Sequence, residues 1–232
     1  MTWLATTPGP DLPVPEGLAR LRPPVVGTGS VTIADTGEPL VAVGPALPTL
    51  PVYASMPLEH RPREQRLRAS VLQALIPADI ALPDPWRLCL IDCWRPVAFQ
   101  EALLEHYGAV MGDTAEFVAR TDGPVPPPHT TGGAVDLTLA FDGVPLSLGT
   151  DFDAFTPDAA PAAFEDPVTG ESAHQGAAAR AAVRDARRLL AHVLGGQGFV
   201  VHPLEWWHWE LGTHYWAQVT GAATAVYDLV ED

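Results

Sequence analysis

One short stretch near the C-terminus, residues 203–210, strongly restricts the folds open to this chain. It places Glu205 three residues before His208, inside a run that also contains three tryptophans. So much aromatic surface calls for burial, and a buried carboxylate or imidazole must be compensated by a partner. A bound metal ion with an activated water would provide that compensation. Its other ligands should then lie elsewhere in the chain.

The composition describes a globular protein that can bury a sizeable core. The chain has 232 residues, of which 47% are hydrophobic, and this suits one sizeable domain. Residues 1–35 are irregular and rich in Pro and Gly. We therefore predict an N-terminal extension at 1–35 ahead of a main domain at 36–232.

The charge and the hydrophobic pattern restrict the possible partners. The formal net charge is −15 and no basic stripe is visible, which argues against nucleic acid. No apolar run approaches the roughly 20 residues that a membrane span needs. The first residues also lack the basic and apolar regions of a signal peptide. We expect a cytoplasmic protein with neither a nucleic-acid nor a membrane partner; the sequence does not indicate the oligomeric state.

The hydrophobic periodicity predicts helices and strands that are interspersed without βαβ regularity. Residues 86–92 are apolar on both faces and are therefore predicted as a central strand. The fold class that fits is α+β, with a small antiparallel β-sheet flanked by helices. The other predicted elements are helices at 63–76, 96–107, 114–120 and 176–194, strands at 30–35, 40–43, 134–141, 198–201 and 207–211, and a hairpin turn at 142–143.

A second stretch, residues 129–136, contains candidates for the remaining metal ligands. His129 and Asp136 are seven residues apart, and the Gly132-Gly133 pair between them can bend the backbone and bring both side chains together. With His208 they form two imidazoles and one carboxylate, a standard shell for catalytic zinc that leaves one position for water. The same set also suits iron(II). Taken alone, each pair is also typical of an ordinary hydrogen-bonded histidine and carboxylate.

Two further side chains would complete a hydrolytic site. Glu205 is a spare carboxylate that could accept a proton from an activated water and pass it to a leaving amine. Arg95 follows the predicted strand at 86–92 and could stabilise a negatively charged tetrahedral intermediate. As a single arginine it could equally form a surface ion pair. Together Glu205 and Arg95 favour hydrolysis over oxygen chemistry.

Other catalytic classes lack their usual signatures in this sequence. It contains no G-x-S-x-G elbow, no phosphate-binding G-x-x-x-x-G-K-[ST] loop and no dinucleotide fingerprint. Cys89 and Cys93 are predicted to be buried hydrophobic residues without a disulfide. His202 and His214 lie near the 203–210 stretch and are predicted to be structural.

The chain contains four motifs in this order: Asp92-x-x-Arg95-Pro96, His129-x-x-Gly132-x-Ala134-x-Asp136, Leu148-Gly149-Thr150-x-Phe152-Asp153-x-Phe155 and Glu205-Trp206-Trp207-His208. In this order and spacing they resemble the zinc D-alanyl-D-alanine dipeptidases of the vancomycin-resistance type. The resemblance covers roughly residues 40–217. It implies an α+β fold in which a small antiparallel sheet carries the zinc, as in D,D-carboxypeptidases and hedgehog-like domains.

The resemblance also implies roles for five residues. His129, Asp136 and His208 would hold one zinc ion per chain. Glu205 would be the general base and acid, and Arg95 would stabilise the transition state. The resemblance thus implies a zinc metallopeptidase, a hydrolase whose main domain is catalytic.

The implied substrate is D-Ala-D-Ala or a related short D-amino-acid dipeptide. Asp153 matches the aspartate that receives the free amino group of the dipeptide, and Asp92 matches the acid beside the arginine. Pro127 stands where the family typically has a serine that helps to hold the substrate. This departure concerns affinity and selectivity rather than zinc binding. The alternatives are a peptidoglycan D,D-carboxypeptidase or endopeptidase and a non-catalytic zinc-binding module.

Overall fold

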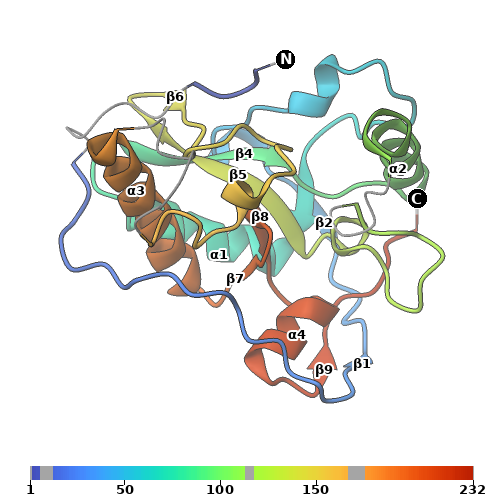
Figure 1. Cartoon of the computed structure of the whole chain (residues 1–232). Helices are drawn as coiled ribbons and strands as arrows, with labels where there is room; N and C mark the ends of the chain where they lie inside the picture. The colour runs from blue at the N-terminus through green and yellow to red at the C-terminus, as the bar shows by residue number, and fades with distance from the viewer. Residues whose placement is uncertain (1, 6–12, 113–117, 167–175, 232) are drawn as a thin grey trace.

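The computed structural model describes the chain except for residues 1, 6–12, 113–117, 167–175 and 232. It combines helices with small sheets in the predicted α+β arrangement (Figure 1). The helices are α1 (Ala69–Ile80), α2 (Val97–Met111), α3 (Ala177–Gly195) and α4 (His214–Thr220), and the strands are β1 (Thr32–Ile33), β2 (Leu40–Ala42), β3 (Arg66–Arg68), β4 (Trp86–Asp92), β5 (Ala134–Phe141), β6 (Val144–Pro145), β7 (Val200–His202), β8 (Glu205–Glu210) and β9 (Thr224–Ala225).

The main sheet has five strands, and each pairing within it is antiparallel. Its order is β4-β5-β8-β7, and β6 pairs with β5 across the predicted hairpin. Asp142 and Gly143 have φ values of 49° and 77°. Two consecutive positive φ values are what a two-residue type I′ hairpin turn requires, so this turn follows from its sequence.

The register of the main sheet aligns three polar residues. Asp92 at the end of β4 lies opposite Asp136 in β5, and Asp136 lies opposite His208 in β8. Side chains that lie opposite each other in a ladder project to the same face, with Cβ atoms about 4.5–5.5 Å apart. Three distant parts of the sequence therefore meet at one place on the sheet.

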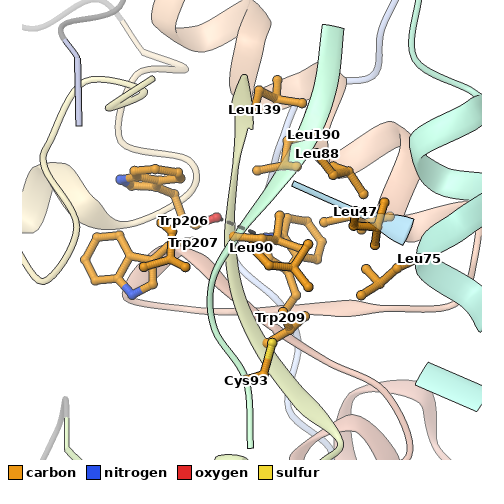
Figure 2. Close-up of a cluster of buried hydrophobic side chains, with 14 of the residues drawn as sticks. Leu47, Leu75, Leu88, Leu90, Cys93, Leu139, Leu190, Trp206, Trp207 and Trp209 are labelled. Carbon is orange, nitrogen blue, oxygen red and sulfur yellow. Dashed lines mark hydrogen bonds between the residues drawn. The ribbon is translucent and has the colours of Figure 1, made fainter. Parts of the chain in front are cut away.

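A core of leucines and tryptophans packs the main sheet against α1 and α3. Leu88 and Leu90 of β4 and Leu139 of β5 are completely buried. They meet Leu75 of α1 and Leu190 of α3, and Figure 2 shows these side chains with the tryptophans of β8. Burying one such side chain stabilises the fold by about 1.5–3 kcal/mol. The polar row thus stands on a rigid platform.

Two smaller sheets connect the N-terminal part of the chain to the rest. β1 pairs in parallel with β9, and β2 pairs antiparallel with β3. The described residues before β1 also contact the main domain. Leu4 is buried, Ala5 forms a bridge with Leu146, and the Trp86 Nε1–H donates to the Pro13 carbonyl over 3.0 Å. The division of the chain at residue 35 stays a prediction.

The predicted helix at 63–76 is wrong at both ends. Residues 66–68 form β3, because pairing with β2 and the burial of Leu67 outweigh the local helical spacing. The helix then continues through Pro77, which the prediction placed in a loop. Pro77 removes one backbone hydrogen bond from α1 but lies only one turn from its end. The helix closes where the Ala81 N–H donates to the Pro77 carbonyl.

The strand at 86–92 is present, but the prediction that it is central is wrong, because β4 ends the strand order of the main sheet. Irregular chain covers its free edge. The Leu90 N–H donates to the Pro48 carbonyl over 2.9 Å, and the Leu50 N–H donates to the Leu90 carbonyl over 2.7 Å. A strand that is apolar on both faces can therefore lie at an edge when other chain covers that edge.

The remaining predicted helices and strands are present and differ from their predicted bounds only near the ends, except for the helix at 114–120. That prediction falls mainly on residues 113–117, which lie outside the described part of the chain. Cys89 and Cys93 are buried and free, as predicted. In the described ranges, no helix combines the length and the apolar character needed to cross a bilayer.

Candidate active site

His129 reaches the polar row of the main sheet through a tight turn. It lies in a short 3-10 helix (Pro128–Thr131) that leads into β5. Gly132 ends this helix with a φ of 72°, and a Cβ added to it would lie 2.4 Å from Leu40 Cδ2. Only glycine suits such a position. The bend expected from the Gly132-Gly133 pair is therefore present, and it sets His129 beside Asp136.

Three buried atoms converge at the end of this turn. His129 Nε2 lies 3.1 Å from His208 Nδ1, and His208 Nδ1 lies 3.0 Å from Asp136 Oδ1. The third side of the triangle, from His129 Nε2 to Asp136 Oδ1, measures 3.3 Å. The structure thus brings together the three residues that the sequence nominated as metal ligands.

The outer nitrogen of each imidazole has its own acceptor. His129 Nδ1 lies 2.7 Å from the Cys93 carbonyl, and His208 Nε2 lies 3.1 Å from Glu210 Oε1. A carbonyl or carboxylate accepts only from an N–H, so these contacts place a proton on the outer nitrogen of each ring. The two inner nitrogens then point lone pairs at each other and at the Asp136 carboxylate. Without a proton on either inner nitrogen such a triangle is repulsive, and either a proton on His208 Nδ1 or a bound metal ion relieves the repulsion.

The triangle also fits the size of a divalent metal ion. Zn²⁺ binds imidazole nitrogen and carboxylate oxygen at about 2.0–2.1 Å, so two ligands of a tetrahedral site lie about 3.3 Å apart. The measured sides of 3.0, 3.1 and 3.3 Å approach that value. Two imidazoles and one carboxylate leave one tetrahedral position open, which is the pattern of a catalytic rather than a structural site.

Glu210 is a member of the site that the sequence analysis missed. It is completely buried, accepts the His208 Nε2–H through one oxygen, and accepts the Thr213 hydroxyl through the other. Although burial alone lowers the pKa of His208, contacts with Asp136 and Glu210 raise it to about 10. The sequence does contain a pattern that could have indicated Glu210, because Glu210 lies two residues after His208 and so projects from the same face of β8.

Arg95 lies beside the triangle and is buried rather than on the surface. Its Nε–H donates to Asp92 Oδ2 over 2.5 Å, and one amino group donates to Gln100 Oε1 over 3.0 Å. The other amino group donates to Asp136 Oδ2 over 3.3 Å. Its guanidinium also lies over the Tyr53 ring, 5.3 Å from the centroid. Asp92 therefore orients Arg95, and Gln100 is a further partner that no sequence pattern indicated.

Glu205 faces the same cavity but stands apart from the triangle. Its Oε2 lies 4.0 Å from His208 Nδ1 and 3.6 Å from His202 Nδ1. Burial raises the pKa of the Glu205 carboxyl to about 8. Within the part of the chain that the structure describes, His202 Nδ1 has no hydrogen-bond partner, and burial lowers the pKa of His202 to about 4. A carboxylate near the metal ligands that is free to gain and lose a proton suits acid–base work.

The cavity that contains these groups is small. It measures about 220 Å³, below the roughly 300–1,000 Å³ of most small-molecule sites. Asp153 lies in its wall, where Asp153 Oδ2 accepts the Tyr53 hydroxyl over 2.7 Å and the Tyr107 hydroxyl as well. Burial raises the pKa of Asp153 to about 7. Pro127 also lines the cavity, and a proline has neither a hydroxyl nor an N–H to offer a ligand.

Comparison with known proteins identifies the family. A family model described as D-ala-D-ala dipeptidase, peptidase M15, matches residues 67–222. The chain belongs to this family. A D-alanyl-D-alanine dipeptidase from Synechocystis sp. is 29% identical over 225 residues, which cover 81% of this chain and 87% of that protein. Peptidases of this family are metal-dependent, so the chain is a metallopeptidase and the resemblance seen in its motifs is confirmed.

Proposed function

We propose that this chain is a zinc-dependent dipeptidase that hydrolyses D-Ala-D-Ala or a related short D-amino-acid dipeptide. The observation that carries the proposal is the lone-pair triangle of His129, Asp136 and His208, with sides of 3.0–3.3 Å and an acid–base carboxylate on the same cavity. The family membership and the name of the Synechocystis relative support the substrate class.

His129, Asp136 and His208 would hold one zinc ion per chain. When bound, the ion supplies a water of lowered pKa and polarises the carbonyl of the scissile bond. The two neutral imidazoles offer their inner nitrogens, while Cys93 and Glu210 hold the outer N–H groups. These outer contacts keep the ligands oriented and strengthen them as donors.

Glu205 would move the protons of the reaction. Its carboxylate takes a proton from the attacking water and later returns it to the nitrogen of the leaving amino acid. The distance of 4.0 Å between Glu205 Oε2 and His208 Nδ1 keeps the carboxylate outside the ligand set but within reach of a water beside it. Glu205 is buried, which limits the loss of the proton to bulk solvent.

Arg95 would stabilise the negative charge that develops on the carbonyl oxygen in the transition state. The buried Arg95 guanidinium is fixed by Asp92 and Gln100, so it need not reorganise during the reaction. Although burial lowers the pKa of Arg95, the combined attraction of Asp92, Tyr53 and Asp136 raises it far above its usual range, and the guanidinium stays charged throughout. Asp92 would therefore act on the substrate indirectly, by positioning Arg95.

Asp153 would bind the ammonium group of the dipeptide. It is the acid that lines the cavity away from the metal ligands, and two tyrosine hydroxyls hold it. A cavity of about 220 Å³ with an acid in its wall favours a short substrate with a free amino group over a peptidoglycan strand. The cytoplasmic location and the lack of nucleic-acid and membrane partners stay predictions from the sequence.

The test is a panel of dipeptides incubated with the purified, zinc-loaded protein, with and without a chelator. We expect release of free amino acids from D-Ala-D-Ala or a related dipeptide, and loss of turnover with the chelator. Glu205→Gln should keep its zinc and lose about 10²–10⁴-fold in kcat. Glu38→Gln is the matched control, because Glu38 accepts from Ser70 and Tyr227 away from the cavity.

Two results would contradict the proposal. If a protein with full zinc occupancy turned over no dipeptide, the chain would be a non-catalytic metal-binding module. If it released D-Ala only from muropeptides, it would be a D,D-carboxypeptidase. A Glu205→Gln variant with a wild-type rate would contradict only the assignment of Glu205 as the residue that transfers the proton.

A further inference from the structure

A second cavity lies directly behind the acid that closes the active site. This outer cavity measures about 450 Å³, and its walls include Trp3, Met56 and Phe152. Tyr107 and Asp153 line both the outer cavity and the active-site cavity. These two side chains thus form the partition between two spaces, one of which has no role in the proposed reaction.

Hydrogen bonds and ring packing hold the partition in place. The Tyr107 hydroxyl, from the C-terminal part of α2, donates to Asp153 Oδ2, and the Tyr53 hydroxyl donates to the same oxygen over 2.7 Å. The Tyr107 ring packs edge-on against Phe155, with centroids 5.2 Å apart. Asp153 itself has a φ of 55°, in the left-handed region that aspartate adopts more readily than most non-glycine residues.

The partition leaves one oxygen for the substrate. Both tyrosine hydroxyls use Asp153 Oδ2, and the described residues provide no hydrogen bond to Oδ1. An ammonium group that pairs with Oδ1 ends the substrate at this point, because Tyr107 fills the space beyond. A peptide with one more residue would place a neutral amide against the buried carboxylate and its next residue against the Tyr107 ring.

The outer cavity could accommodate such an extra residue if the partition were open. Its walls are mainly apolar, with the aromatic rings of Trp3 and Phe152 and the side chain of Met56. They also include Asp151, whose oxygens accept the backbone N–H groups of Trp3, Leu4 and Phe152 but retain lone pairs for an ammonium group displaced by one residue. The space beyond Tyr107 therefore has the chemistry of a further subsite.

We propose that Tyr107 determines specificity: with Asp153 it closes the active site to any residue before the dipeptide, and the outer cavity is a subsite that this closure hides. This inference rests on the proposed dipeptidase function. It assigns the restriction to dipeptides to one side chain of α2, which touches the substrate end of the cavity and not the metal ligands.

The experiment compares D-Ala-D-Ala, D-Ala-D-Ala-D-Ala and N-acetyl-D-Ala-D-Ala as substrates of zinc-loaded wild-type and variant proteins. Wild type should cleave the dipeptide far better than either extended substrate. In Tyr107→Ala the ratio of kcat/KM for the dipeptide to that for the tripeptide should fall by about tenfold or more, since even small changes in a pocket shift discrimination by about 10–200-fold.

Tyr107→Phe separates the hydroxyl from the ring. It keeps the partition but removes one hydrogen bond to the carboxylate, so KM for the dipeptide should rise by about tenfold while the substrate ratio stays near that of wild type. Tyr227→Phe is the matched control, because its hydroxyl also donates to a carboxylate, that of Glu38, far from the cavity. This control should change neither KM nor the ratio.

Each outcome decides something different. A wild type that cleaves no dipeptide would reject the proposed function itself. A wild type that cleaves the tripeptide with the same kcat/KM as the dipeptide would contradict the partition. An unchanged ratio of kcat/KM for dipeptide and tripeptide in a folded, zinc-bound Tyr107→Ala would contradict it too. If Tyr107→Ala fails to fold, Tyr107→Leu takes its place, because leucine preserves apolar packing but is too short to reach Asp153, and its ratio then decides.

Discussion

Removal of the Glu210 carboxylate should weaken zinc binding without unfolding the main sheet. Glu210 Oε1 accepts the Nε2–H of His208 over 3.1 Å, and both residues are buried. In Glu210→Ala the proton can move to His208 Nδ1, the atom that would bind the metal. A hydrogen bond to a charged group contributes about 1.5–3 kcal/mol. Loss of a residue that orients a metal-binding histidine lowers metal affinity by about 10–100-fold, which agrees with that range.

The assay is competition for zinc between the protein and a chromophoric chelator of known affinity. We expect the zinc Kd of Glu210→Ala to rise by about 10–100-fold. The zinc Kd of Glu210→Gln should lie between those of wild type and Glu210→Ala, because the amide oxygen of glutamine can still accept the Nε2–H of His208. Glu38→Gln should bind zinc like wild type, since Glu38 has no contact with the metal ligands. A folded Glu210→Ala that binds zinc as tightly as wild type would refute the reasoning.

Three further outcomes concern the substrate. Because burial raises the pKa of Asp153 to about 7, its carboxyl becomes protonated below that pH and loses its pairing with an ammonium group. The kcat/KM for the dipeptide should therefore fall as pH drops through about 7, below the fall near pH 8 that protonation of Glu205 produces, and Asp153→Asn should lack only the step near pH 7. Pro127 has φ −53° and ψ 134°, a conformation that serine also adopts. Pro127→Ser should therefore add a hydrogen-bond donor and lower KM by about three- to tenfold in steady-state assays. An unchanged KM would show that this position does not contact the substrate. The Asp151 carboxylate accepts the backbone N–H groups of Trp3 and Leu4 over 2.7 and 3.0 Å and so connects the N-terminal segment to the loop that contains Asp153. Asp151→Ala should raise KM by about tenfold and leave zinc affinity unchanged. Equal effects on KM and zinc affinity would indicate general unfolding instead.

The main sheet could be predicted from the sequence because its signals are local. β5 is mostly apolar and ends at the Asp142-Gly143 turn, and its bounds agree with the prediction. β3 could not be predicted in this way. It depends on pairing between Leu40 and Arg68, and on the buried Arg68 guanidinium, which donates to the carbonyl oxygens of Thr131 and Asp228. Partners so far away leave no local pattern.

The residues of the site also differ in whether a local sequence pattern indicates them. The candidate ligands could be found because a histidine, a glycine pair and an aspartate lie close together in the sequence, and because a glutamate and a histidine stand out among tryptophans. Gln100 and Tyr107 could not be found, since both lie on α2 among ordinary helical residues and gain their meaning only from Arg95 and Asp153, which other elements place beside them.

Two buried aspartates that line the same cavity, Asp136 and Asp153, have pKa values shifted in opposite directions. Although burial alone raises the pKa of Asp136, His129 and His208 lower it far below its usual range. The pKa of Asp153 rises to about 7, because hydrogen bonds from two tyrosines and a distant Arg95 offset only part of the cost of burial. Asp136 thus has Arg95, His129 and His208 as partners within the protein, and a bound metal ion would join them. Among the described residues Asp153 has no ion-pair partner, so a positive charge would have to come from outside, and under the proposed function the free amino group of a dipeptide would provide it.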